Sequence, residues 1–168
     1  PDSKNTAWRN DSFRGYADYM QTSGFEENLN RCIALAKRER VVLMCAEAVP
    51  WRCHRSLVAD ALFIQAHGAW ERTEWGRVLL LFRQITTLQP RALLFWDMAA
   101  WHMAWNAGTA ALNDRSQPRL ALRIKAQREY FALGRDFLER GIKNNPDRPQ
   151  LYEALARLYR DKYNDHEH

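Results

Sequence analysis

The chain has 168 residues, of which 46% are hydrophobic and 12% aromatic, enough apolar material for a packed globular core. Charged residues interrupt each apolar stretch well before the about 20 residues that a membrane-spanning helix needs, so we expect no membrane segment. The net charge of +5 comes from 25 basic and 20 acidic residues that are mixed along the chain, which argues against a nucleic-acid-binding protein.

The beginning of the chain and its cysteines bear on origin and compartment. The sequence does not begin with Met, so we expect it to be part of a longer protein. It does not open with a basic segment followed by an apolar leader, which predicts a cytoplasmic location. Cys32, Cys45 and Cys53 do not form the even, regularly spaced set of a disulfide framework, so we predict reduced thiols.

The amino-terminal third predicts helices around one short strand. A short aromatic helix over 13–20 is followed by a helix over 24–38, which begins at a Ser and Glu in the spacing of a capping box. Val41 to Cys45 is brief and rich in β-branched residues, and this pattern predicts a buried strand. Pro50 then forces a loop, and a further helix is predicted over 52–65.

From about residue 67 the composition changes to long helices separated by proline, glycine or Asn/Asp clusters. These helices are predicted over 70–88, 91–107, 118–144 and 149–163. The fold class is therefore predicted as mainly α, with antiparallel helical hairpins preceded by a truncated α/β segment that has at most one or two short strands.

The first part of the chain is similar to a known family. The run from Phe13 to Met20 and the run from Cys45 to Leu62 make residues 1 to about 65 resemble the middle of the family called domain of unknown function 488. This resemblance implies a small α/β domain with a parallel sheet and no assigned activity. Strands expected before and after the segment are missing, so the domain here would be truncated, and a strand without partners leaves backbone groups unpaired.

The second part resembles an unrelated family, the bacterial tetratricopeptide-like helical proteins. The resemblance is carried by three runs: Leu81 to Pro90, Trp96 to His102, and Asn144 to Pro149. It implies stacked helical hairpins. We therefore predict a truncated α/β domain over 1–66 and a tetratricopeptide-like domain over 67–168, and we consider a natural or engineered chimera of the two families.

The densest group of reactive side chains follows the predicted strand and consists of Cys45, Glu47, Arg52, Cys53, His54 and Arg55. A thiol at a helix start beside cationic groups ionises readily, so Cys53 is the candidate nucleophile. Free amides at that helix start, together with Arg55, suit a phosphate or carboxylate ligand, and Glu47 is a candidate proton acceptor. The alternative is that both cysteines of the group are small buried hydrophobes.

Neither a metal nor another cofactor is expected. Adjacent Cys53 and His54 rarely both reach one tetrahedral ion, and no second Cys pair completes a zinc site. Among the helices, Trp101 and Trp105 are four residues apart and share a face, which predicts a buried packing face; the alternative is an aromatic ligand groove. His102 is interpreted as a hydrogen-bonded helix residue.

A basic set on the third long helix is interpreted as a solvated face. It consists of Arg119, Arg123, Lys125 and Arg128, with Glu129.

Three functional hypotheses follow. The favoured one is a helical scaffold or protein-interaction module that takes a protein or peptide partner. The alternative is an anion-binding site or thiol-dependent enzyme built on Cys53-His54-Arg55, and the third is a chimera without evolved activity. Nucleic acid and membrane partners are not expected, whereas an oligomer through the unpaired strand Val41 to Cys45 is one way to satisfy its backbone.

Overall fold

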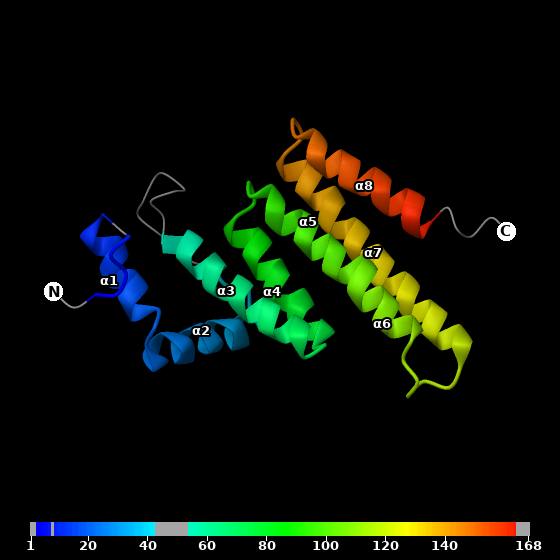
Figure 1. Cartoon of the computed structure of the whole chain (residues 1–168), viewed down its shortest axis with the longest axis horizontal. Coiled ribbons are helices and arrows are strands. Elements are labelled where there is room, and N and C mark those ends of the chain that lie inside the picture. Colours follow the sequence, from blue (N-terminus) through cyan, green and yellow to red (C-terminus); the bar gives the residue numbers. More distant parts are fainter. Residues whose placement is uncertain (1–2, 8, 43–53, 164–168) are drawn as a thin grey trace. The chain divides into compact units, whose positions relative to one another are not determined.

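The computed structural model describes residues 3–7, 9–42 and 54–163, and all regular structure in these ranges is helical, without strands (Figure 1). The chain divides into two compact units, Pro1–Ala61 and Leu62–His168. The prediction of a mainly α chain is confirmed at this level, whereas a tetratricopeptide-like arrangement is not shown. In the ranges that the structure describes, no helix has the length and apolar character to cross a membrane.

The first unit contains α1 (Asp11–Tyr19) and α2 (Ser23–Ala36). The Asn10 side chain caps α1 by accepting hydrogen bonds from two backbone amides of the first turn. Thr22, not Ser23 as the capping-box pattern predicts, caps α2, because its Oγ1 lies 3.2 Å from the backbone nitrogen of Phe25. Phe25 packs edge-on against Tyr16 of α1 with ring centroids 6.2 Å apart, so the two helices share an aromatic contact.

The predicted buried strand is wrong for the residues of it that the structure describes. Val41 and Val42 have no regular structure and both are exposed, Val42 by 79%. In the described ranges no neighbouring strand offers these residues a hydrogen-bonded ladder, so their β-branched side chains have no sheet to pack on. The remaining residues of the prediction, 43–45, lie outside the described residues.

Helix α3 (His54–Glu71) leads into the second unit, which also holds α4 (Trp75–Leu88), α7 (Leu120–Asn144) and α8 (Pro149–Lys162). Between α4 and α7 lies one continuous helical run formed by α5 (Leu93–Trp101), the π-helix η2 (His102–Ala107) and α6 (Gly108–Leu112). The single helix predicted over 70–88 is broken by a turn at Thr73, whose φ is +57°. The predicted break at residue 108 occurs only after Leu112.

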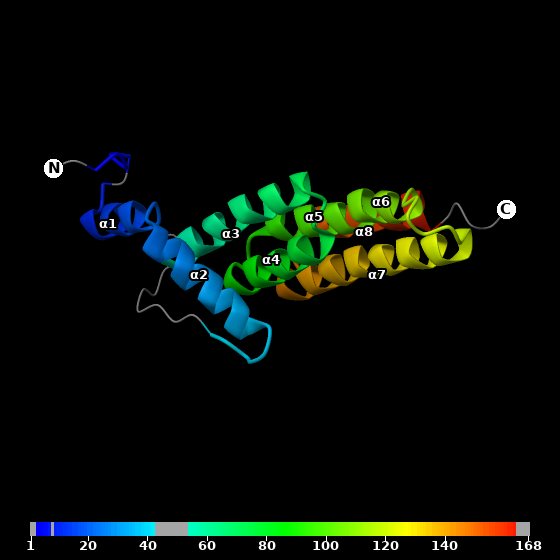
Figure 2. The same ribbon diagram turned by 90° about the horizontal axis from the view of Figure 1, so that it is seen from below.

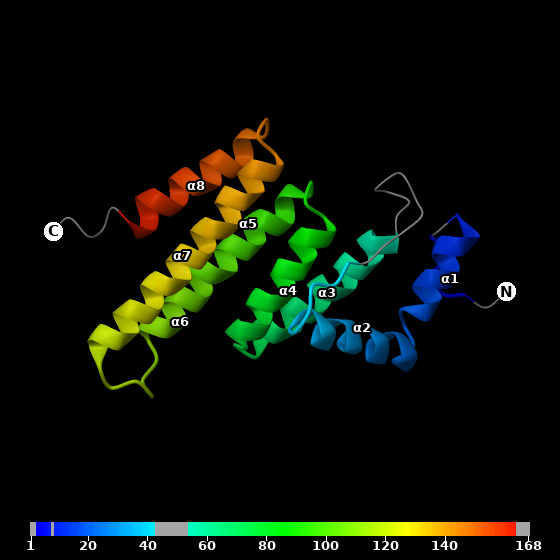
Figure 3. The same ribbon diagram turned by 180° about the vertical axis from the view of Figure 1, so that it is seen from behind.

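The helices of the second unit pack on one another in chain order. α7 runs alongside the α5–η2–α6 run and α8 packs on both α7 and α5, an arrangement visible in Figures 1 and 3. In Figure 2, α5, α6 and α8 form one layer, and α4 and α7 form the other. The core between the layers is mainly aliphatic and aromatic, with Phe82, Trp96 and Phe137 among its largest fully buried side chains.

Small residues set the close approach of α7 to the α5–η2–α6 run. A Cβ atom placed on Gly134 would lie 2.8 Å from the Cβ of Ala104 and 3.0 Å from the carbonyl oxygen of Ala100. A Cβ on Gly141 would likewise meet the side chain of Trp96 at 2.9 Å. Glycine at these two positions therefore provides the space for the neighbouring helix.

The tryptophan prediction is partly wrong. Trp101 is 41% exposed and Trp105 is half-buried, whereas Trp96 is the buried tryptophan of this run at 2% exposure. The buried stripe follows Trp96, Ala100 and Ala104, and Trp101 stands about 100° further around the helix than Ala100. Four-residue spacing places two tryptophans on one face, but it does not say which face points to the core.

Candidate functional site

The structure describes only part of the predicted reactive cluster. Cys45, Glu47, Arg52 and Cys53 lie outside the described residues, and the described part of α3 begins at His54. The assembly of this site and the role of Cys53 therefore stay predictions.

What the structure does describe is the helix that follows the cluster. Arg55 is half-buried in the first turn of α3. Leu57, Val58 and Leu62 are buried, as expected for the inner face of the predicted helix. In the ranges that the structure describes, no group of His, Cys, Asp and Glu side chains has the geometry to hold a metal ion.

A second cluster of aromatic and histidine side chains lies where α5 becomes η2. The ring of His102 lies 5.4 Å from that of Trp70, 5.5 Å from that of Phe82 and 5.1 Å from that of Trp101, measured between centroids. His102 is 4% exposed, and burial, with a smaller contribution from the charge of His67, lowers its pKa to about 4. His102 is therefore neutral at pH 7.

The neutral His102 ring has a hydrogen-bond partner in its own helix. Its Nδ1 lies 3.2 Å from the Asn106 side-chain nitrogen Nδ2, one turn further along η2. The geometry agrees with the interpretation of His102 as a hydrogen-bonded helix residue. Because the ring is enclosed by aromatic side chains, it contributes to packing and does not face an open site.

The third feature is a stretch of α7 that α8 does not reach. The last residues of α8 pack near the middle of α7: the Tyr163 ring lies 6.3 Å from that of Phe131, and the Lys162 ammonium lies 5.5 Å from the same ring. Lys162 also lies 5.2 Å from the Trp105 ring of η2. The first half of α7, residues 120–130, therefore extends beyond the end of α8, as the ribbon in Figure 1 shows.

Apolar side chains stay accessible on this uncovered stretch. Leu120 is 55% exposed, Leu122 is also exposed, and Ile124 is half-buried. Ile124 precedes Phe131 by seven residues, two helical turns, so it continues the stripe of α7 that faces the end of α8. An aliphatic strip thus begins where the packing of α8 ends.

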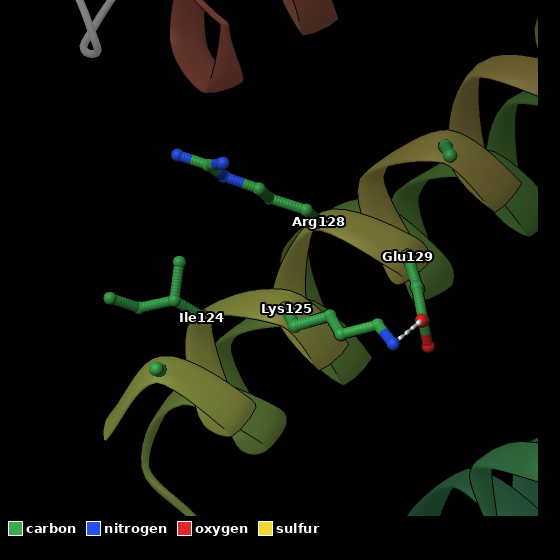
Figure 4. Close-up of a pocket in the computed structure, with 6 residues that line it drawn as sticks. Ile124, Lys125, Arg128 and Glu129 are labelled. Atoms are coloured by element: carbon green, nitrogen blue, oxygen red, sulfur yellow. Dashed lines mark ion pairs between the residues drawn. The ribbon is translucent and has the colours of Figure 1, made fainter. Parts of the chain in front are cut away.

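A shallow hollow of about 360 Å³ lies on the same stretch of helix. Its lining residues all belong to α7 and are Ala121, Ile124, Lys125, Arg128, Glu129 and Ala132. Figure 4 shows Lys125 and Glu129 joined across one turn, with a nitrogen–oxygen distance of 4.0 Å, while Ile124 and Arg128 extend in another direction. The hollow and Leu120 together are called the α7 surface below.

Cations outnumber acids on and beside the α7 surface. Five cations and no acid occur over residues 115–128. The acids that bracket this stretch are both engaged, since Asp114 accepts hydrogen bonds from the amide and hydroxyl of Ser116 and Glu129 pairs with Lys125. Within the described part of the chain, Arg119 and Arg128 have no ion-pair partner. The surface therefore combines exposed aliphatic side chains with unneutralised guanidinium groups.

Sequence reasoning identified the cations of this stretch but interpreted them as a solvated face. It missed the combination with exposed Leu120, because the sequence does not tell where α8 ends relative to α7. The seven-residue spacing from Ile124 to Phe131 places both side chains on one side of the helix, and this spacing was the sequence signal that could have indicated the aliphatic strip.

Comparison with known proteins bears on the first unit only. Residues 1–62 match the family described as Domain of unknown function DUF488. The match covers the first unit and ends within α3. The predicted resemblance of residues 68–168 to tetratricopeptide-like proteins has no support from a family match. Neither the curated proteins nor the solved structures show a significant match to the chain.

Proposed function

We propose that the chain is a helical protein-interaction module whose second unit, Leu62–His168, binds a peptide or helix of a partner protein. The observation that carries this proposal is the α7 surface, where exposed Leu120 lies beside guanidinium groups that lack ion-pair partners in the described chain. Exposed apolar groups grouped beside charges are typical of protein-interaction sites.

The helix pairs of the second unit support a scaffold built from stacked hairpins. α4 packs on α5, α7 packs on the α5–η2–α6 run, and α8 packs on α7, so consecutive helices are neighbours throughout. We propose that this succession is a short tetratricopeptide-like array, in which each helix pair presents side chains to a partner. Such arrays bind extended or helical peptides on faces that the stacking leaves uncovered.

The proposal is tested by panning a displayed library of random peptides, about 16 residues long, against the full chain; this length gives a helix of about 24 Å. Selected peptides are resynthesised and their Kd is measured by fluorescence anisotropy. We expect binders with micromolar Kd that protect amides of the second unit from hydrogen exchange. A library that yields only peptides with no measurable affinity in solution would contradict the interaction function.

A second candidate function is kept because the residues from His54 onward are helical, as the helix predicted over 52–65 requires. If that helix begins near Cys53, its backbone amides and Arg55 would favour the thiolate and an anionic ligand. We expect Cys53 to react with iodoacetamide faster than Cys32, with protection by phosphate, and Arg55→Leu to slow the reaction. An alkylation rate equal to that of a model peptide, without phosphate protection, would exclude this function.

The chimera hypothesis is compatible with both candidates. The DUF488 match ends at residue 62, and the compact units meet between Ala61 and Leu62. This coincidence supports a junction of two unrelated segments within α3. If neither peptide binding nor a reactive Cys53 is found, a folded chimera without evolved activity becomes the best description of the chain.

A further inference from the structure

We infer that the α7 surface docks an acidic amphipathic helix of a partner protein. This inference rests on the proposed interaction function and goes further, because it names the surface and the chemistry of the partner. Three observations support it: among the described residues α8 leaves part of one stripe of α7 accessible, cations predominate along this stripe, and residues 113–129 include no aromatic side chain.

The open track continues an interface that the chain itself already uses. α8 packs through Leu151, Ala154 and Leu158, which are all buried. Its last described residues reach Phe131, and the same stripe of α7 continues through Ile124 to Leu120. A partner helix with the apolar spacing of α8 can pack on this continuation in the way that α8 packs on the second half of α7.

The charge of the track selects an acidic partner. Over residues 115–129 the chain carries five cations and one acid, Glu129, which pairs with Lys125. Carboxylates flanking the apolar stripe of a helix would meet Arg119 and Arg128, neither of which has an ion-pair partner among the described residues. Guanidinium and carboxylate groups form paired hydrogen bonds, and opposite charges accelerate the encounter of the two partners.

The side-chain types favour a protein over a nucleic acid or a membrane. Residues 113–129 include no aromatic side chain on which a base could stack or which could insert at a lipid interface. The accessible apolar groups of the α7 surface are aliphatic, chiefly Leu120 and Ile124. Aliphatic side chains between cations match the apolar and acidic faces of an amphipathic helix.

The test uses the full chain and a synthetic fluorescent peptide of about 14 residues, four helical turns, with Leu on one face and Glu on its flanks. An isomer with Lys in place of Glu and a scrambled acidic peptide serve as controls. We expect the acidic amphipathic peptide alone to bind, and its Kd to rise as salt is added, because salt screens exposed charge pairs. Equal binding of the Lys isomer or the scrambled peptide would overturn the inference.

Two variants of the α7 surface locate the binding. Leu120→Glu and Arg128→Glu change exposed side chains that the fold does not need, and each should weaken peptide binding about five- to ten-fold by opposing the acidic partner. Leu94→Glu and Arg83→Glu are the matched controls, since both residues are exposed and lie on α5 and α4. Circular dichroism checks that all four variants keep their helix content.

The possible outcomes distinguish a failure of the acidic-helix inference from a failure of the proposed interaction function. Peptides selected from the random library that bind Leu120→Glu and Arg128→Glu as well as the unchanged chain would leave the interaction function standing and overturn the acidic-helix surface. The inference also falls if vesicles of anionic lipid or a single-stranded RNA bind more tightly than the peptide and compete with it. Self-association in sedimentation that Leu120→Glu abolishes would assign the surface to a second copy and overturn the inference as well.

Discussion

At the scale of single residues, burial decides what His102 does. Aromatic rings enclose the imidazole, and the cost of burying a charge lowers its pKa to about 4. A histidine with these neighbours is a packing residue that stays neutral at pH 7. The sequence indicated a helix residue with a local hydrogen bond, but it did not indicate the enclosure, because Trp70 and Phe82 come from two other helices.

The pKa of His102 predicts how stability changes with pH. The unfolded chain binds a proton at this residue below about pH 6.5, whereas the folded chain does so only near pH 4. Stability should therefore fall as the pH drops through this window, by up to about 1.4 kcal/mol per pH unit from this residue. Urea unfolding between pH 7 and pH 4.5 measures the slope.

Two variants isolate the contribution of His102 to that slope. His102→Gln should flatten the slope above pH 5, where few carboxylates titrate, even though the variant is less stable at pH 7. His67→Gln is the comparison: the charge of His67 contributes less than burial to the lowered pKa of His102, so this variant should change the slope less than His102→Gln does. An unaltered slope in His102→Gln would show that other groups cause the acid sensitivity.

Asn145 joins two loops that the sequence treats as simple helix breaks. Its buried side-chain amide donates to the carbonyl oxygen of Pro90 at 2.8 Å and to that of Gly141 at 3.0 Å. The indole nitrogen of Trp96 also donates to the Pro90 oxygen, at 3.0 Å. One carbonyl group between α4 and α5 is therefore tied to the end of α7.

We predict that Asn145→Ala destabilises the second unit by about 1–3 kcal/mol, because a buried carbonyl loses a donor and a small cavity forms. Asn145→Asp should cost more, since a carboxylate cannot donate and would lie beside two carbonyl oxygens. Asn144→Ala is the matched control: its amide bonds only the Arg140 carbonyl and is exposed. Chemical denaturation followed by tryptophan fluorescence compares the variants, and equal losses at 144 and 145 would contradict this account.

At the scale of elements, the sequence predicts which segments are helical better than it predicts which side of each helix faces the core. The helices over 118–144 and 149–163 are found at Leu120–Asn144 and Pro149–Lys162, because proline and Asn/Asp clusters end helices locally. Trp101 was placed wrongly, because the direction of a face depends on helices elsewhere in the chain. The strand predicted over 41–45 is wrong at Val41 and Val42 for a similar reason, because a strand needs a partner strand elsewhere in the chain.

The close approach of α7 to the α5–η2–α6 run predicts a strong effect at Gly134. Gly134→Ala would place a Cβ 2.8 Å from the Cβ of Ala104, so the helices must separate. We expect a net loss of about 1–2 kcal/mol, since overpacking costs about 1–3 kcal/mol and exceeds the helix propensity gained on replacing glycine by alanine.

Gly76→Ala is the control for this prediction. No atom outside its local helix lies within 4 Å of a Cβ at that position, so its stability should be unchanged or slightly higher. Thermal unfolding followed by circular dichroism gives both values. A Gly134→Ala chain as stable as Gly76→Ala would mean that the two helices yield easily at this contact.

At the scale of the whole molecule, the chain divides into two compact units. The DUF488 match covers residues 1–62, and the division into compact units falls at the same place, inside α3. The reactive cluster belongs to the first unit and the α7 surface to the second. The sequence could point to the cluster because its residues are consecutive, but the α7 surface depends on where α8 ends, which requires the fold.

The division into units makes a prediction about cooperativity. Residues that contact one another densely open together, so a perturbation in one unit should raise hydrogen exchange mainly within that unit. Gly134→Ala lies on α7, and we expect amides of α5, α7 and α8 to exchange faster in this variant while those of α1 and α2 keep their rates. Hydrogen exchange with mass spectrometry on the full chain resolves these helices as separate peptides.

Faster exchange in α1 and α2, by the same factor as in α7, would show that the chain unfolds as a single cooperative body. The boundary inside α3 would then not separate two units of independent stability. Unchanged rates there would show that the second unit keeps its own stability.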